Sequence, residues 1–189
     1  MSMDPEIRPA PTPAPASPAR ATINWLRDLS LSVLIAIVVI LFLYQPVKVE
    51  GTSMMPALVD QERIFINKFV YRLGFSEISR GDTVVFWFPQ DTSKSYIKRV
   101  IGIPGDHVQV KDGRVFVNGS PLVEPYVPEE YRDRSSTPYT TVPPNEFFVM
   151  GDHRSSSNDS RTWGFVGRSY IYGKAVFVYW PLDRMGLLR

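Results

Sequence analysis

Three short segments of this 189-residue chain hold the side chains that could do chemistry. The first contains Ser53, the second contains Lys98, and the third is a polar stretch at residues 151–161. The chain has no cysteine, which excludes thiolate nucleophiles, thiolate zinc sites and disulfide bonds. The candidate nucleophiles are therefore serines, and the candidate bases are Lys98, His107 and His153.

A serine hydroxyl needs a base to take its proton, and a lysine amine can be that base only when it is neutral. The reference pKa of lysine is about 10.4, so burial or nearby positive charge must lower it. The apolar neighbours Ile97 and Val100 could supply such an environment for Lys98. Taken singly, each segment also has a plain structural interpretation: a turn, a solvated strand residue and a polar loop.

Lys98 also stands three residues after Ser95, which fits the S-x-x-K pattern of penicillin-binding enzymes. That pattern works on a helix, where side chains three residues apart share a face. Residues 96–101 have the composition of a strand, in which an odd spacing puts two side chains on opposite faces. We therefore reject Ser95 as the nucleophile.

The order of these segments resembles that of the bacterial type I signal peptidases, in their single-anchor form. Residues 53–58, Ser-Met-Met-Pro-Ala-Leu, look like the nucleophile box of that family. Residues 96–106 match its lysine box almost residue for residue, and residues 81–85 and 151–161 resemble two further boxes. The resemblance spans the chain from about residue 25 to residue 181.

The resemblance implies a membrane-bound serine endopeptidase that cuts signal peptides from exported preproteins after small residues, in the pattern Ala-X-Ala. Ser53 would be the nucleophile and Lys98 the general base of a Ser–Lys dyad, and no metal or cofactor is implied. The backbone N–H of Ser53 would donate to the oxyanion. The substrate would lie extended along exposed strand edges near residues 49–51 and 96–98.

Supporting roles follow from the same resemblance. Ser157 would hold the lysine amine in line, while Arg99, Asp159 and Arg161 would form a structural ion-pair network. Gly51 stands where many family members carry a serine whose hydroxyl completes the oxyanion hole. We expect a serine to be tolerated at that position, with activity unchanged or raised.

Alternatives stay open for the mechanism and for the function. His153 stands where the last box of the family usually has asparagine; we interpret it as a polar loop residue, with a Ser53–His153 pair as the rival mechanism. A conjugation- or pilin-type processing peptidase would share these boxes, and an inactive membrane-tethered binding domain would share the fold. A self-cleaving repressor of the same fold would need a DNA-binding module, and the N-terminal sequence does not resemble one.

The elements that carry these residues begin with an apolar segment. Residues 29–47 hold no charge, and at 1.5 Å per residue they would span roughly 28 Å, close to the thickness of a bilayer core. A core helix would show a polar face, and a cleaved signal would want small residues before its cut, so we favour an uncleaved anchor. Arginines concentrate before the segment, which favours a cytoplasmic N-terminus.

We accordingly divide the chain into a disordered Pro/Ala-rich tail (1–22), a transmembrane anchor (23–47) and an exported serine peptidase domain (48–189). The resemblance places the protein in the bacterial plasma membrane, with one crossing and the catalytic domain on the exported side. Its expected partners are preprotein signal peptides, the lipid bilayer and the secretion translocon. Nucleic acid is not an expected partner, because 21 Lys and Arg against 19 Asp and Glu leave the chain close to charge balance.

Beyond the anchor the sequence predicts a mostly β domain. Short apolar or alternating runs stand between turn signals such as Asp112-Gly113 and Asn118-Gly119. This pattern favours an antiparallel barrel-like or sandwich-like domain, of the signal peptidase and LexA-like type by resemblance. A smaller β excursion is expected at about residues 107–145, with 121–144 irregular. The expected strands are residues 63–67, 83–88, 96–101, 107–110, 114–117, 146–150 and 174–180.

Overall fold

The computed structural model describes residues 18–71 and 77–188. The chain divides into two compact units, residues 1–40 and 41–189, and each is described by itself. Residues 1–17 of the expected tail lie outside the described residues, whereas residues 18–22 belong to a helix.

Helix α1 (Pro18–Leu43) contains most of the apolar segment. It begins with proline, which lacks a backbone N–H; this is no disadvantage in the first turn of a helix, where backbone N–H groups have no intrahelical acceptor. From Arg20 to Val38 the helix is long and apolar enough to cross a membrane, and none of this stretch is buried within the protein. Its crossing of a bilayer stays a prediction. The helix ends at Leu43 and not at residue 47 as expected, because Pro46 removes a helical N–H and disfavours helix before it.

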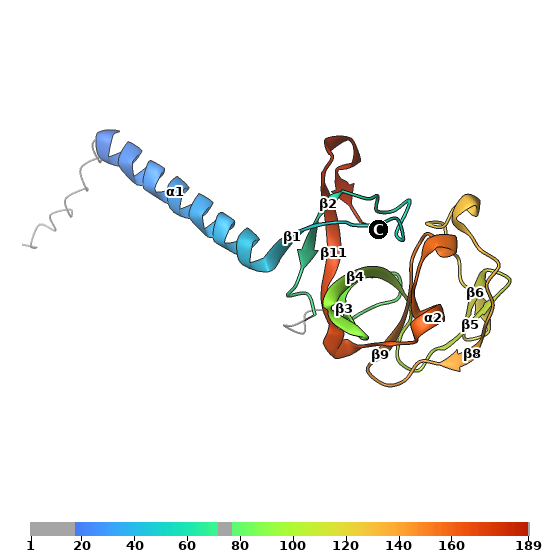
Figure 1. Cartoon of the computed structure of the whole chain (residues 1–189). Coiled ribbons are helices and arrows are strands. Elements are labelled where there is room, and N and C mark those ends of the chain that lie inside the picture. Colours follow the sequence, from blue (N-terminus) through green and yellow to red (C-terminus); the bar gives the residue numbers. More distant parts are fainter. Residues whose placement is uncertain (1–17, 72–76, 189) are drawn as a thin grey trace, which may run out of the picture. The chain divides into compact units, whose positions relative to one another are not determined.

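The larger sheet is antiparallel and carries the candidate site. Its strand order is β1-β2-β11-β3-β4-β9-β10, with β12 paired to β11 (Figure 1). Among the described residues nothing joins β1 to β10, so the sheet is open and the expected barrel does not close. Pro46 in β1 cannot donate to a further strand, which suits an edge. The bounds are β1 (Tyr44–Lys48), β2 (Arg63–Asn67), β3 (Thr83–Phe88), β4 (Asp91–Gly102), β9 (Glu146–Met150), β10 (Val166–Gly167), β11 (Ile171–Trp180) and β12 (Gly186–Leu187).

A smaller antiparallel sheet has the order β7-β6-β5-β8 and lies beside β9 (Figure 1). The two predicted turns have positive φ at both central residues, Asp112-Gly113 and Asn118-Gly119, as tight hairpins require. Residues 121–144 are not wholly irregular, because they contain β8 and a short 3₁₀ turn, η1. The bounds are β5 (His107–Lys111), β6 (Arg114–Val117), β7 (Ser120–Pro121), β8 (Thr137–Thr141) and η1 (Glu129–Tyr131).

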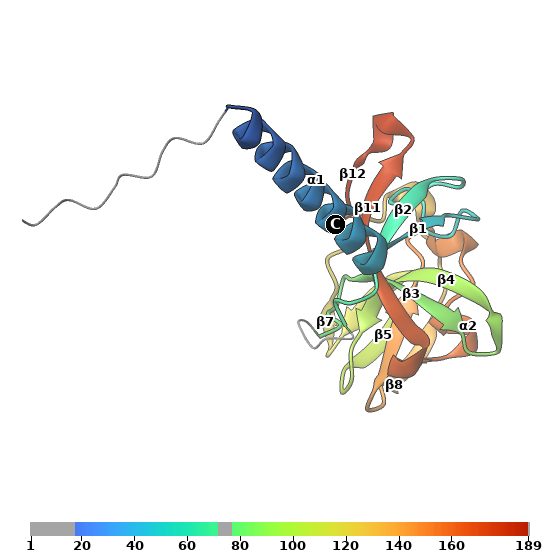
Figure 2. The same cartoon turned by 90° about the vertical axis from the view of Figure 1, so that its left-hand side faces the viewer.

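Apolar cores hold the strands of the candidate site in place. Strands β3 and β4 cross the middle of the domain (Figure 2). One core lies beneath the loop that precedes β2, and it consists of Val49, Met54, Leu58, Ile64, Ile66, Val85, Ala175 and Val178. Another joins the two sheets through Ile101, Phe148 and Met150 on one side and Val108, Val110, Val115, Val117 and Val142 on the other. Each fully buried Leu, Ile or Val contributes about 1.5–3 kcal/mol. The buried residues of β4 lie in its second half, from Lys98 to Gly102, so this part of the strand is firmly packed.

Candidate active site

Ser53 lies in the turn-rich segment that connects β1 to β2. The segment is closed at its base by backbone hydrogen bonds that pair Val49 with Glu62 and Gln61. Met54 and Leu58 are buried beneath the segment, and the Leu58 N–H donates to the Met54 carbonyl. The buried side chains of Val49, Met54 and Leu58 thus hold the segment that carries Ser53 in place.

Lys98 lies in β4, opposite Val84 of β3. Its Nζ is 2.6 Å from Ser53 Oγ, which is a hydrogen-bond distance. The lysine side chain is only 4% exposed. The structure therefore brings together the two residues that the sequence analysis selected as nucleophile and base.

The environment of Lys98 changes its acidity. Burial lowers its pKa from the ordinary value of 10.5 to about 8, while the carboxylates of Asp159 and Asp152 act in the opposite direction. Burial penalises the charged amine because a low-dielectric interior solvates it poorly. An amine with such a pKa is neutral in a substantial fraction of molecules at mildly alkaline pH.

Residues 151–161, the site loop, run beside this pair and contain the 3₁₀ turn η2 (Arg154–Ser156) and the start of α2 (Ser160–Trp163). Arg99 forms a buried ion pair with Asp152, at 2.7 Å from Nη2 to Oδ2. Burial raises the pKa of Asp152 even though Arg99 opposes this. Asp159 pairs with Arg161 at 2.8 Å. Asp159 and Arg161 therefore pair with each other, whereas Arg99 pairs with Asp152, a partner that the sequence analysis did not select.

Ser157 and His153 make contacts different from those considered from the sequence. Ser157 Oγ is buried and has no hydrogen-bond partner among the described residues, so the expected bond to the Lys98 amine is absent from this structure. The N–H of His153 donates to the Ser53 carbonyl, and its Nδ1 lies 3.2 Å from the Thr52 carbonyl. Because a carbonyl only accepts, Nδ1 carries the proton of this bond, and these two hydrogen bonds of the histidine go to backbone carbonyls and not to the serine hydroxyl.

The backbone near Ser53 is suited to an oxyanion. Within the described residues, the Ser53 N–H has no acceptor and is available to a ligand. Gly51 has φ of +91°, a conformation that side chains of L-residues rarely adopt. This conformation would strain a serine at position 51, so the structure favours a loss of activity on that substitution, contrary to the expectation from the sequence. Asp60 was missed in the sequence: it accepts the Gly51 N–H at 2.8 Å, and this bond holds the pKa of Asp60 below its ordinary value.

A cavity of about 330 Å³ opens onto the Ser53–Lys98 pair. Residues 49–51 and 96–98, the two expected substrate edges, both line it. The remaining lining residues are Val47, Lys48, Met54, Val85, Ser95, Asn158 and Tyr172. Within residues 18–71 and 77–188, no group of three or more histidine and acidic side chains is placed to hold a metal ion.

Comparison with known proteins identifies the family. The family described as signal peptidase, peptidase S26, has a sequence model that matches residues 22–180. The chain belongs to the signal peptidase family. This signal peptidase is thus a serine endopeptidase that cleaves signal peptides, and it has an N-terminal apolar helix consistent with a membrane anchor.

Individual relatives agree with this assignment. Signal peptidase I T of Bacillus subtilis is 38% identical over 86% of this chain and 88% of its own length. Signal peptidase I of Leptolyngbya laminosa is 36% identical over 95% of this chain and 94% of its own length. A crystal structure of a signal peptidase I from Enterococcus faecalis covers 52% of this chain and 97% of its own, at 32% identity and a TM-score of 0.46. That structural similarity is too low to support a statement about the fold.

Proposed function

We propose that this signal peptidase works by a Ser–Lys dyad, with Ser53 as nucleophile and Lys98 as general base. The observation that supports this most directly is the 2.6 Å contact between Ser53 Oγ and a buried amine whose pKa is lowered to about 8. A neutral amine at this distance can accept the hydroxyl proton as the oxygen attacks a carbonyl carbon. No other base is needed for the step.

The reaction then follows from the geometry. Attack of Ser53 Oγ on the scissile carbonyl forms a tetrahedral intermediate whose oxyanion accepts the Ser53 N–H. The Lys98 ammonium returns its proton to the leaving amine, the C–N bond breaks, and an acyl-enzyme remains. Lys98 next takes a proton from water, which attacks the ester, and collapse of this second intermediate releases Ser53 and the signal peptide.

We propose further that the cavity selects small residues, in the pattern Ala-X-Ala. An extended substrate would pair with the backbone near residues 49–51 and 96–98 and turn alternate side chains towards the cavity. Its walls include the apolar side chains of Met54, Val85 and Ile97. In this proposal they would accept a methyl group and clash with larger side chains.

The membrane setting is also a proposal. Helix α1 would cross the bacterial plasma membrane once, with the N-terminus cytoplasmic and the peptidase domain on the exported side, beside the secretion translocon. The concentration of arginine before the apolar segment supports this orientation. Protease added outside spheroplasts should digest residues 48–189. Protection of these residues until lysis would contradict the orientation.

The catalytic proposal is tested with detergent-solubilised full-length protein and a preprotein that carries an Ala-X-Ala site. Sequencing the new N-terminus should show cleavage directly after the second alanine. Ser53→Ala and Lys98→Ala should give no product, because each removes one member of the dyad. The exposed residues Ser155 and Lys94 provide matched controls, and Ser155→Ala and Lys94→Ala should cleave normally. Full activity of Lys98→Ala would exclude the dyad.

A further inference from the structure

We propose that residues 121–135, which we call the strap, are a positioning element for the active site. Two of its acids, Glu124 and Asp133, orient two arginines of the site loop, and these arginines hold the loop against the backbone of Ser53. Neither acid lies within the segments that the sequence analysis selected. The catalytic consequence rests on the proposed function, whereas the positioning itself can be measured without it.

The first contact is a buried, two-pronged ion pair. Nη1 of Arg154 donates to Oε2 of Glu124 at 3.0 Å, and Nη2 donates to Oε1. Both side chains are only 1% exposed. Arg132 of the strap lies 3.7 Å from the same carboxylate. Two parallel bonds fix the plane of a guanidinium, so Glu124 sets the direction in which the third donor of Arg154 points.

The third donor of Arg154, its Nε, is connected to Ser53 through Gly151. Nε of Arg154 donates to the Gly151 carbonyl at 3.0 Å. A Cβ added to Gly151 would lie 2.4 Å from the Ser53 carbonyl oxygen and 2.3 Å from Ser157 Oγ, so the backbones are in close contact here. The His153 N–H also donates to the Ser53 carbonyl. A shift of the site loop at Gly151 would therefore move Ser53.

The second contact is built in the same way. Nη1 of Arg161 donates to Oδ2 of Asp133 at 2.6 Å and to Ser135 Oγ at 3.2 Å. Nη2 of Arg161 donates to the Arg154 carbonyl and to Asp159, whose Oδ2 in turn accepts the Gly151 N–H. Each strap acid thus fixes an arginine that bonds to a carbonyl of the site loop.

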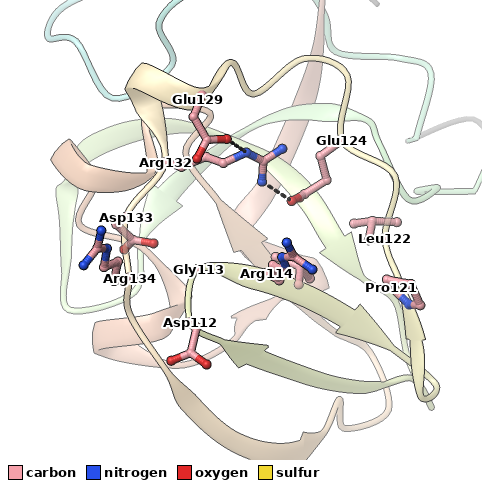
Figure 3. A pocket seen from close by; sticks show the side chains of 11 residues that line it. Asp112, Gly113, Arg114, Pro121, Leu122, Glu124, Glu129, Arg132, Asp133 and Arg134 are labelled. Atoms are coloured by element: carbon pink, nitrogen blue, oxygen red, sulfur yellow. Dashed lines mark ion pairs between the residues drawn. The ribbon is translucent and has the colours of Figure 1, made fainter.

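On the side away from the site loop, the strap lies next to the β5–β6 hairpin, from which a cavity separates its middle part. Its two ends bond to the β5–β6 hairpin, where the Leu122 N–H donates to Val115 and the Gly113 N–H donates to Ser135. Between these ends, a cavity of about 650 Å³ separates the hairpin from the strap (Figure 3). The polar contacts of Glu124 are accordingly made on the side of the site loop and within the strap, where the Tyr126 hydroxyl also donates to Oε1 at 3.3 Å.

Aromatic contacts complete the attachment. The Arg99 guanidinium lies 4.2 Å from the centre of the Tyr126 ring, and Arg99 directly follows Lys98 in β4. The Tyr131 ring meets the His153 ring edge-on, with their centres 4.7 Å apart. The strap consequently contacts β4, which carries Lys98, and the site loop, which contacts the backbone of Ser53.

The test must separate positioning from stability. Glu124→Gln alone leaves Arg154 buried without a full counter-charge, which can prevent folding. We therefore use Glu124→Leu with Arg154→Met, since replacing both members of a buried pair by apolar residues of similar size often preserves stability. Hydrogen exchange of residues 149–158 is then compared with wild type in the full-length protein in detergent. We expect faster exchange at the Gly151 and His153 amides while the melting temperature is retained, and wild-type exchange in a stable double variant would overturn the proposal.

Cleavage kinetics give the second readout. The double variant should lose about 10- to 100-fold in kcat with KM within about twofold, because a misplaced nucleophile slows chemistry more than binding. The matched control is Glu129→Gln, which removes an exposed charge from the same strap and should leave kcat unchanged. Wild-type kcat in the double variant, or an equal loss in Glu129→Gln, would contradict the proposal. Failure of the wild type to cleave would contradict the proposed function, and the exchange data would still decide the role of the strap.

Discussion

At the scale of single residues, burial sets the chemistry of Lys98. The amine is desolvated by the strands around it, and this lowers its pKa to about 8 despite the nearby carboxylates of Asp152 and Asp159. An ordinary lysine would be almost wholly protonated at neutral pH and unable to accept a proton. The same burial that activates the base also costs stability, so both properties can be tested with one residue.

The pH dependence of cleavage should identify the base. With Lys98 as base, kcat/KM should rise with pH through a midpoint near 8, because only the neutral amine is active. A histidine base would place that midpoint near its reference pKa of about 6.5. We expect Lys98→Ala to be inactive and His153→Asn to keep both rate and midpoint. The opposite result for the two variants would favour Ser53–His153.

Thermal unfolding in detergent should reveal the stability cost of the same amine. The folded pKa lies below the ordinary value of 10.5, so the unfolded chain binds the proton more tightly, and the penalty is full below about pH 8 and absent above about 10.5. Lys98→Met should therefore gain ~3 kcal/mol at pH 7, and this gain should fade as pH rises to 10.5. Lys94→Met, at an exposed position, is the control. A gain that does not change with pH would contradict the explanation.

Gly51 is a test of backbone conformation. Its φ of +91° costs an L-residue about 1–3 kcal/mol, although the space around the Cα is open. Gly51→Ala and Gly51→Ser should both lower kcat/KM by a similar factor, because the strain and not the hydroxyl dominates. Comparing the two variants separates the effects. Higher activity in the serine variant than in wild type would show that a hydroxyl donor outweighs the strain.

At the scale of elements, a short turn near the C-terminus supports the nucleophile loop. Arg184 in the 3₁₀ turn η4 (Leu182–Arg184) bonds through Nε to Glu62, and its Nη2 donates to the Pro56 carbonyl at 2.9 Å. Glu62 is buried and also accepts the Val59 N–H at 2.9 Å. The loop that carries Ser53 is thus tied to the far end of the chain.

Arg184→Ala should destabilise the protein. Glu62 would lose its cation while staying buried, at a cost of about 1–3 kcal/mol, which partial exposure of Arg184 reduces towards the lower end. Melting temperature measured in detergent is the readout, and Asp183→Ala in the same turn is the control. Equal effects of the two substitutions would show that the turn and not the ion pair matters.

At the scale of the whole molecule, the peptidase domain contains its own apolar cores. Among the described residues, the buried members of the two cores described above lie between Val49 and Val178, and residues 41–189 form one compact unit. Strand β1 pairs with β2 along all five of its residues, so it belongs to this unit although the sequence analysis assigned most of it to the anchor. The boundary at which the domain can be cut out therefore lies before Tyr44.

Two truncations test that boundary. Residues 44–189 should fold and cleave a peptide substrate, whereas residues 48–189 should melt at a lower temperature because β2 loses its edge partner. Circular dichroism during heating is the measurement for both fragments. Equal melting temperatures would show that β1 adds nothing to the domain, and an unfolded 44–189 fragment would show that the domain depends on the segment before it.

The sequence by itself determined the family, the apolar helix and most of the strands. The seven expected strands are all present, and β2, β3, β6 and β9 have the predicted bounds. This succeeded because alternation of apolar residues and Asp-Gly or Asn-Gly turns are local signals, readable without the rest of the chain. Ser53 and Lys98 lie in separate segments of the sequence, and the resemblance to the signal peptidases predicted that they act together as a dyad.

Only the tertiary structure could decide which side chains meet. The ion pairs of Arg99 with Asp152 and of Arg154 with Glu124 each join residues far apart in sequence. The order of the strands, which leaves the larger sheet open, also depends on distant segments. The conformation of Gly51 likewise depends on the bond from its N–H to Asp60 across the loop. Local patterns report the period of an element, whereas burial, charge pairing and strand order depend on how the elements pack, and this is why these features had to be observed.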